Sequence, residues 1–317
     1  MGSSVTESAR QSIIIMKNEI KKYFSGKRMY VFLALMGALV FILAVIPPIL
    51  GKDGDPIYFY MLSSLVVLMA STLFASISIV SEYEERTALI ILTRPIRKTS
   101  IFIGKALAAY LISLAFMALY YLVAAIVSLC FKQSVSIDLL VSFGYACVYA
   151  FATTGIAMTV SAFMKKSSTA TIITFVILAV IFLALSTVLG IADVETDWLL
   201  DQCSNSICTS SSEYRDYSNK MMSDLLQMLA YPGAFVDFDK FAVVLNILLE
   251  RTDVTADMLN GVMSDPNYGI WNMSTLQKYI GSTFVEAPDG PHDVLCMIAW
   301  GVAGFIAAFL KFCRREF

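Results

Sequence analysis

The chain has 317 residues, of which 58% are hydrophobic and only 15% are charged. A soluble globular domain is about half apolar and about a quarter charged, so this composition excludes an ordinary water-soluble fold and indicates the lipid bilayer. The net charge of -2 excludes the basic surface of a nucleic-acid-binding protein, and the single histidine excludes a histidine-rich metal site.

Six segments without any charged residue predict membrane-spanning helices. Each approaches or exceeds the roughly 20 residues that a spanning helix requires. They cover residues 29–51, 56–81, 106–131, 139–164, 167–192 and 294–310. Their apolar residues are continuous rather than alternating, as between Val31 and Met36, which favours helices over the strands of a β-barrel. We therefore expect an all-α membrane protein with six transmembrane helices.

Residues 1–28, ahead of the first span, are predicted to contain a basic amphipathic helix. Apolar residues at positions 13, 16, 20, 23 and 24 follow helical spacing. Such a helix beside a span is typical of an interfacial helix on the inner leaflet. The alternative is an N-terminal extension of the first span. The basic residues of this segment are Lys17, Lys21, Lys22, Lys27 and Arg28.

Residues 29–192 hold the first five spans, and their most charged connection is the segment 81–105. Ser81 and Glu84 match a capping box, which predicts a helix that runs to about Arg94 and ends before Pro95. A short helix with one apolar and one charged face is a docking element; the alternative is a connector with solvated charges. The residues concerned are Glu82, Glu84, Glu85, Arg86, Arg94, Pro95, Arg97 and Lys98.

The basic residues also predict the orientation. The N-terminal segment, the segment 81–105, the pair Lys165 and Lys166, and the C-terminal tail are all basic. Cytoplasmic loops carry the excess of Lys and Arg, so both termini are expected in the cytoplasm of a multi-pass cell-membrane protein. Residues 193–291 are then extracellular, and residues 292–317 form the sixth helix and a short basic tail.

The acidic segment 193–291 is expected to be a mostly helical extracellular domain. Helical spacing occurs at 220–231, 239–251, 255–263 and 274–280. Its acidity indicates a solvated surface or, as the alternative, attraction of a cationic ligand. Cys203 and Cys208 lie in a polar tract, where they could form a small disulfide loop or, as the alternative, a pair of metal ligands.

The chemistry missing from the sequence limits the function. No Gly-x4-Gly-Lys-Ser/Thr loop occurs, so the chain is not expected to bind ATP itself. The six uncharged segments contain no Asp, Glu, Lys, Arg or His, whereas ion-coupled transporters usually keep such groups at membrane depth. A passive bundle moved by an external energy source is therefore predicted, in preference to an ion-coupled carrier.

These features together resemble the permease subunit of ABC-2 type transporters. Four sequence features match. They are the basic N-terminal helix, the acidic run Glu82-Tyr83-Glu84-Glu85, the hydrophobic turn 89–93 before Arg94-Pro95, and the pair Gly104-Lys105. Two features depart from the family pattern. Thr87 stands where many members have glycine, and residues 193–291 are much longer than the outer helices usual in the family.

The resemblance implies an ABC-2, type V exporter-like permease fold and substrate export driven by a separate ATP-binding subunit. ATP and Mg would bind that subunit, while this chain would hold no catalytic, cofactor or metal site. The N-terminal helix and the charged residues of segment 81–105 would contact the ATP-binding subunit. A second permease copy or homologue, the bilayer and an extracellular partner would complete the assembly. The alternative function is a membrane scaffold or sensor with an extracellular receptor domain.

Overall fold

A computed structural model describes residues 2–49, 57–85, 97–132, 135–192, 194–229, 285 and 287–314. All regular structure within these ranges is helical. The chain divides into two compact units, one made of Met1–Ser211 with Pro288–Phe317 and the other of Ser212–Ala287.

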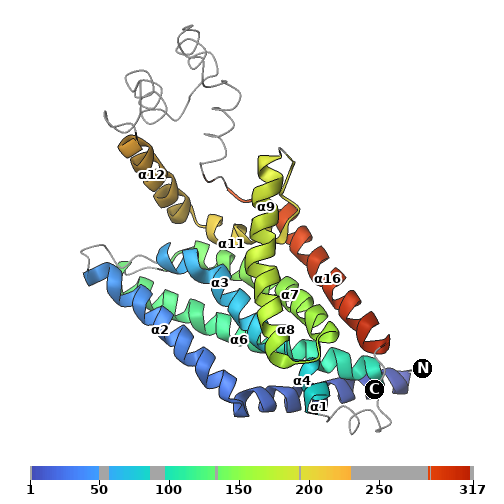
Figure 1. The fold of residues 1–317 in the computed structure, drawn as a ribbon. Helices are drawn as coiled ribbons and strands as arrows, with labels where there is room; N and C mark the ends of the chain where they lie inside the picture. Colours follow the sequence, from blue (N-terminus) through green and yellow to red (C-terminus); the bar gives the residue numbers. More distant parts are fainter. Residues whose placement is uncertain are drawn as a thin grey trace. The chain divides into compact units, whose positions relative to one another are not determined.

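The first unit contains all of the long apolar helices (Figure 1). Its helices are α1 (Gly2–Ser25), α2 (Lys27–Ile49), α3 (Ile57–Phe74), α4 (Val80–Glu84), α6 (Lys98–Lys132), α7 (Ile137–Phe163), α8 (Ser167–Phe175), the π-helical η1 (Val176–Ile181), α9 (Phe182–Ile191), α10 (Leu200–Ser204), α11 (Ser206–Thr209) and α16 (Gly290–Arg314). Among the described residues, six spans are long and apolar enough to cross a membrane, with α8, η1 and α9 forming one of them. The six predicted spans are therefore confirmed.

Helix α7 packs against α16 through small residues that let the two backbones meet. A Cβ atom added at Gly155 would lie 2.6 Å from the carbonyl oxygen of Gly301, and one added at Gly304 would lie 2.6 Å from the carbonyl carbon of Gly155. The Thr159 hydroxyl donates across the same contact to the Gly304 carbonyl at 2.7 Å. Small residues and hydroxyl groups are what helix pairs use inside a bilayer, where lipid tails are as apolar as the helices.

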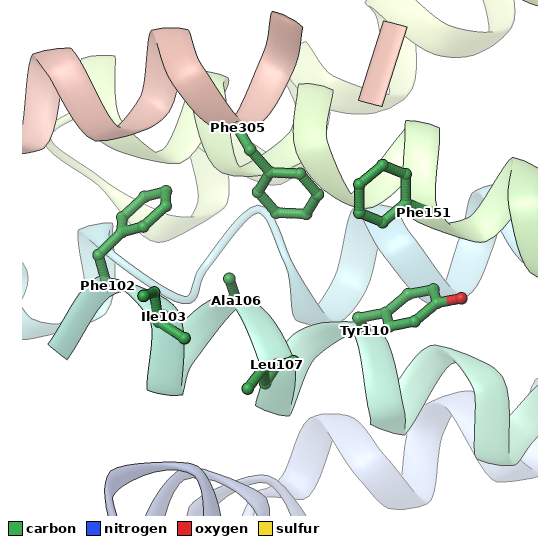
Figure 2. Close-up of a pocket in the computed structure, with 7 residues that line it drawn as sticks. All are labelled: Phe102, Ile103, Ala106, Leu107, Tyr110, Phe151 and Phe305. Atoms are coloured by element: carbon green, nitrogen blue, oxygen red, sulfur yellow. The ribbon is translucent and has the colours of Figure 1, made fainter. Parts of the chain in front are cut away.

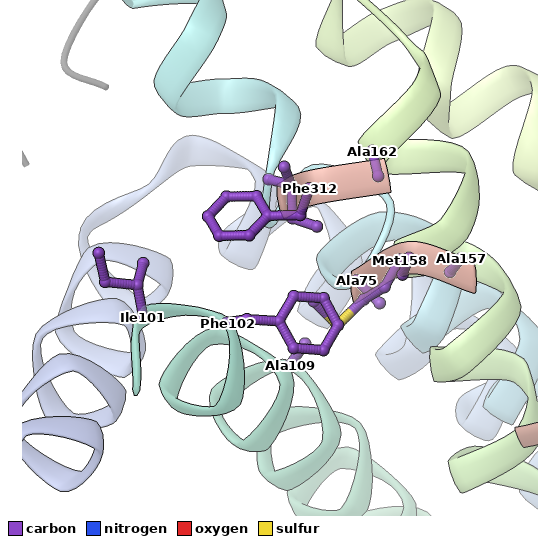
Figure 3. Close-up of a cluster of buried hydrophobic side chains, with 10 residues drawn as sticks. Ala75, Ile101, Phe102, Ala109, Ala157, Met158, Ala162 and Phe312 are labelled. Carbon is purple, nitrogen blue, oxygen red and sulfur yellow. The ribbon is translucent and has the colours of Figure 1, made fainter. Parts of the chain in front are cut away.

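A buried apolar cluster joins α6, α7 and α16 near the end of the bundle at which both termini lie (Figures 1 and 3). Phe102 of α6 contacts Phe312 of α16, with ring centroids 6.0 Å apart. Other members of this cluster are Ala157, Met158 and Ala162 of α7 and Ala75 after α3. Its packing fixes where the first turns of α6 lie.

The opposite end of the bundle is closed by α10 and α11, which pack on α16, α7 and α3. Ser142 of α7 donates a hydrogen bond to the Ile207 carbonyl at 2.6 Å, and the Trp300 indole donates to the Trp198 carbonyl at 3.0 Å. Residues 194–211 are therefore part of the spanning unit.

The second unit contains α12 (Ser212–Leu229) among the described residues. Asn219 of this helix exchanges two hydrogen bonds with the backbone of Val285, at 2.8 and 3.2 Å. Helix α12 overlaps the predicted helix at 220–231. The helices predicted at 239–251, 255–263 and 274–280 lie outside the described residues.

Candidate functional site

Three segments far apart in the sequence meet at a buried ion triad at the end of the bundle that carries both termini. The ammonium of Lys105 on α6 lies 2.6 Å from Oε1 of Glu19 on α1 and 2.6 Å from Oε1 of Glu82 on α4. It also donates to the Ser78 carbonyl at 2.9 Å. Lys105 is fully buried and Glu82 is 4% exposed. We call these three side chains the buried triad.

A buried charge is stable only while its partners are in place. Removing one member of a buried ion pair typically destabilises a protein by about 3–5 kcal/mol, because the remaining charge is left without compensation. The triad has one cation for two carboxylates, and burial raises the pKa of Glu82 while Lys105 opposes that shift. The arrangement therefore holds α1 and α4 against α6 in one geometry.

Glycine 104 allows α1 to lie directly on α6. A Cβ atom at this position would lie 2.7 Å from the carbonyl oxygen of Ser12 and 2.9 Å from the side chain of Ile15. No side chain fits at that distance without displacing α1. The pair Gly104-Lys105 thus provides both the close approach of α1 and the charge that binds it.

Tyr23 connects α1 to the end of α3. Its hydroxyl donates to the Phe74 carbonyl at 3.3 Å, and its ring meets that of Phe74 edge-on at 5.6 Å. Burial raises the pKa of this phenol, and the nearby Glu19 carboxylate raises it further. Tyr23 therefore stays protonated and serves as a hydrogen-bond donor.

The start of α4 is held by a side chain from another helix. The Ser161 hydroxyl on α7 accepts hydrogen bonds from the backbone N–H groups of Ile79 and Val80, both at 3.1 Å. Ile79 occupies the N-cap position and makes no side-chain cap. The predicted capping box of Ser81 and Glu84 is therefore wrong, because the first donors of α4 are already satisfied by α7.

The two carboxylates at the end of α4 have defined partners. Glu84 accepts a hydrogen bond at 2.8 Å from the backbone N–H of Ser167, the first residue of α8. The hydrogen bonds from Ser167 lower the pKa of Glu84. Glu85 forms an exposed ion pair with Lys22 of α1 at 3.2 Å. Helix α4 is thus tied to α1, α6, α7 and α8.

The residues predicted to contact a partner subunit occupy different environments. Glu82 is buried in the triad, whereas Glu84, Glu85, Arg97 and Lys98 are exposed. Lys98 donates to the Cys313 carbonyl at 3.4 Å. Arg86, Arg94 and Pro95 lie outside the described residues, as does the part of the predicted helix between residues 86 and 94.

Helix α1 is separate from the first span. It ends at Ser25, and α2 begins at Lys27 after a bend at Gly26. The side chains of Lys17, Lys21, Lys22 and Arg28 are exposed, and that of Lys27 lies outside the description. Ile13, Ile14 and Phe24 are also about half exposed. This mixture of exposed basic and apolar residues suits a membrane interface.

The disulfide suggested for Cys203 and Cys208 is not formed, and both cysteines are free and buried. Cys203 lies on α10 and directs its thiol to the Asp197 carbonyl at 3.1 Å. Cys208 lies on α11 and directs its thiol to the Tyr60 carbonyl at 3.0 Å. The two short helices turn these side chains toward different acceptors. No group of three or more potential metal-ligating His, Cys, Asp or Glu side chains comes together among the described residues.

The sequence does not reveal the triad, because Lys105 stands at the edge of an uncharged segment. The structure begins α6 at Lys98, so Lys105 lies about 10 Å inside the helix at about 1.5 Å per residue. The expectation that the spanning helices bury no charge is wrong at this end. The apolar run Ile101-Phe102-Ile103 is the signal that could have revealed it. Lys105 follows this run, so it lies within the hydrophobic part of the helix and not at its polar start.

Comparison with known proteins gives a family for nearly the whole chain. The family model described as "ABC-2 family transporter protein" matches residues 7–316. No curated protein matches the chain. The matched region includes the triad, the six spans and the segment between the fifth and sixth spans.

Proposed function

Because the chain belongs to the ABC-2 family of transporter proteins, we propose that it is the permease subunit of an exporter driven by a separate ATP-binding subunit. The coupling contacts are the exposed residues around α4 and the start of α6, together with α1. ATP and Mg bind the partner subunit. Two permease copies, or this chain and a homologue, form the membrane pathway.

The observation that carries the proposal is the buried triad. A permease needs a connection that transmits movement from a partner at the membrane surface into the spanning helices. Lys105 binds α1 and α4 to the first turns of a spanning helix through 2.6 Å contacts. A force applied to α1 or α4 is therefore transmitted to α6 without first bending a flexible loop.

The distribution of charge supports an external energy source. Beyond Lys105, the apolar spans contain no Asp, Glu, Lys, Arg or His until the far end of the bundle, where Asp138, Asp201 and Asp293 lie. A proton or ion relay through the bilayer would need groups between these ends. The triad therefore connects elements at one end and does not form a transmembrane path.

The orientation within this proposal places both termini in the cytoplasm. Both termini lie at the same end of the first unit (Figure 1), and exposed basic residues gather there on α1, at the start of α6 and at Lys165 and Lys166. The positive-inside rule assigns that end to the cytoplasm. Residues 193–291 are then extracellular, where they would meet an extracellular partner.

Co-purification from the native source tests the proposal. The tagged chain is expected to retain an ATP-binding subunit, and inverted membrane vesicles are expected to take up substrate only with ATP. Glu85→Lys reverses the charge of an exposed residue at the end of α4 and should weaken retention. Glu195→Lys, an exposed acid at the opposite end, is the matched control. The proposal fails if no ATP-binding subunit is retained, or if both variants reduce its retention equally.

A further inference from the structure

Two neighbouring cavities lie along α6, one with polar groups in its wall and one almost wholly apolar. Between α1 and the start of α6 lies a cavity of about 550 Å³, whose walls include Ser12, Arg97 and Ser100. A second cavity of about 240 Å³ lies between α6, α7 and α16. Ile103 and Leu107, which are one helical turn apart, line both cavities. We call the two together the α6 groove.

At the polar end, a few groups that can bind an anion stand in walls that are otherwise mostly apolar. Arg97 precedes the first turn of α6, and its guanidinium has no ion-pair partner among the described residues. Ser100 is 2% exposed and lines the cavity, and no hydrogen-bond partner of its hydroxyl occurs in the described part of the chain. The N-terminus of the long helix α6 adds partial positive charge at the same point.

The apolar end is lined by rings and aliphatic side chains. Figure 2 shows Phe151 of α7 and Phe305 of α16 beside Phe102, Ala106 and Tyr110 of α6. The walls expose almost no polar surface. Ile103 and Leu107, which connect this end to the polar cavity, are 43% and 41% exposed, so the groove is open along its side. A hydrocarbon chain is the chemistry that such walls accept.

The length of the groove matches one leaflet. From Arg97 to Tyr110 the helix rises about 20 Å, at about 1.5 Å per residue. Half of a bilayer with its headgroups is also roughly 20 Å thick. A ligand with an anionic head at Arg97 and an acyl chain reaching Phe305 would therefore fill both ends at once.

We propose that the α6 groove binds one anionic phospholipid, with its phosphate at Arg97 and Ser100 and one acyl chain along Ile103 and Leu107 into the cavity formed by Phe102, Phe151 and Phe305. The Arg97 guanidinium binds the phosphate, and guanidinium–phosphate hydrogen bonds are among the strongest that proteins make. The headgroup of an anionic lipid carries no cation to offset that phosphate, so Arg97 favours it over the zwitterionic headgroup of phosphatidylcholine. The lipid covers the contact between α1 and α6 from the membrane side. This site lies apart from the buried triad, and its occupancy does not require the ATP-binding subunit.

Native mass spectrometry of the purified chain in detergent tests this proposal with three probes: phosphatidylglycerol, phosphatidylcholine and inorganic phosphate. We expect one phosphatidylglycerol per chain, retained more tightly than phosphatidylcholine. Arg97→Gln should weaken its binding by about tenfold, because a charged hydrogen bond is lost. Lys98→Gln removes the neighbouring exposed charge, which does not line the groove, and should change binding by less than about twofold.

The apolar end is tested by filling it. Leu107→Trp should prevent the acyl chain from entering and weaken phosphatidylglycerol binding, whereas Leu119→Trp, on an exposed part of the same helix, should not. Ser100→Ala removes the buried hydroxyl without adding volume and should also weaken binding, which keeps the test decisive if a tryptophan variant unfolds.

Four results would overturn the proposal. Equal loss of binding in Arg97→Gln and Lys98→Gln would indicate general charge attraction. Unchanged binding in Leu107→Trp, or displacement of the lipid by millimolar phosphate, would show that no acyl chain occupies the groove. Equal binding of phosphatidylcholine would remove the role of the anionic head. These measurements need no transport, so their failure leaves the proposed function untouched.

Discussion

The ammonium of Lys105 lies 2.6 Å from the carboxylate of Glu19, although 86 residues separate them in the sequence. This contact fastens the N-terminal helix to a spanning helix in a place that water does not reach. Glu82 completes it from the connection after α3. The predictions below test the consequences of this geometry.

Removal of the buried ammonium should strongly destabilise the fold. Lys105→Met leaves Glu19 and Glu82 facing each other without a cation, and we expect a loss of about 3–5 kcal/mol. Denaturant unfolding in detergent micelles measures it. The triple variant Glu19→Gln, Lys105→Met and Glu82→Gln should be more stable than Lys105→Met alone, since it leaves no buried charge. A change within about 0.5 kcal/mol for Lys105→Met, as for a surface site, would contradict the burial of the triad.

The pH dependence of stability should carry a contribution from Glu82. Its pKa is raised in the folded protein, so folding takes up a proton between the ordinary carboxyl pKa and the raised value. Stability from this group is therefore present below the ordinary pKa and decreases as the pH rises through the interval. Glu82→Gln should remove that decrease, which unfolding curves at a series of pH values would reveal. An unchanged pH profile in Glu82→Gln would count against this assignment.

Substitution of Gly104 should release α1 from α6. In Gly104→Val the new side chain meets the Ser12 carbonyl, and we expect a loss of about 1–3 kcal/mol together with faster proteolysis within α1. Gly37→Ala is the matched control, because a Cβ atom there meets nothing within 4 Å. Equal protection of α1 from protease in Gly104→Val and the wild type would show that the close approach is absent.

Two substitutions distinguish whether the start of α4 is capped by Ser161 of α7 or by its own Ser81. Ser161→Ala removes the hydroxyl that accepts from Ile79 and Val80 and should reduce stability by about 1 kcal/mol. Ser81→Ala should have a smaller effect, because Ser81 does not cap α4. A larger loss of stability in Ser81→Ala than in Ser161→Ala would support the local capping box of Ser81 and Glu84.

Cysteine labelling checks the orientation. Cys203 and Cys208 are buried, so they are poor reporters, but Cys130 at the far end of α6 is exposed and Cys313 lies near the C-terminus. In chains that keep one of these cysteines, an impermeant maleimide should label Cys130 on intact cells and Cys313 only after permeabilisation. Labelling of Cys313 on intact cells would place the termini outside.

The spanning helices were predictable because a run of about 20 uncharged residues is a local property of the sequence. The triad was not, because its members come from α1, α4 and α6 and only tertiary packing brings them together. The capping box failed for the same reason, since α7 supplies the acceptor through Ser161. The short spacing of Cys203 and Cys208 suggested proximity but could not show which way each thiol turns.

The glycine contact between α7 and α16 limits how this bundle can move. With Gly155 meeting Gly301 and Gly304 at backbone distance, one helix has no clearance to slide along the other. The hydrogen bond from Thr159 to Gly304 further fixes their register. Helices α7 and α16 therefore keep a fixed position relative to each other. An opening motion has to pivot about this pair and move the helices that are less tightly joined to it.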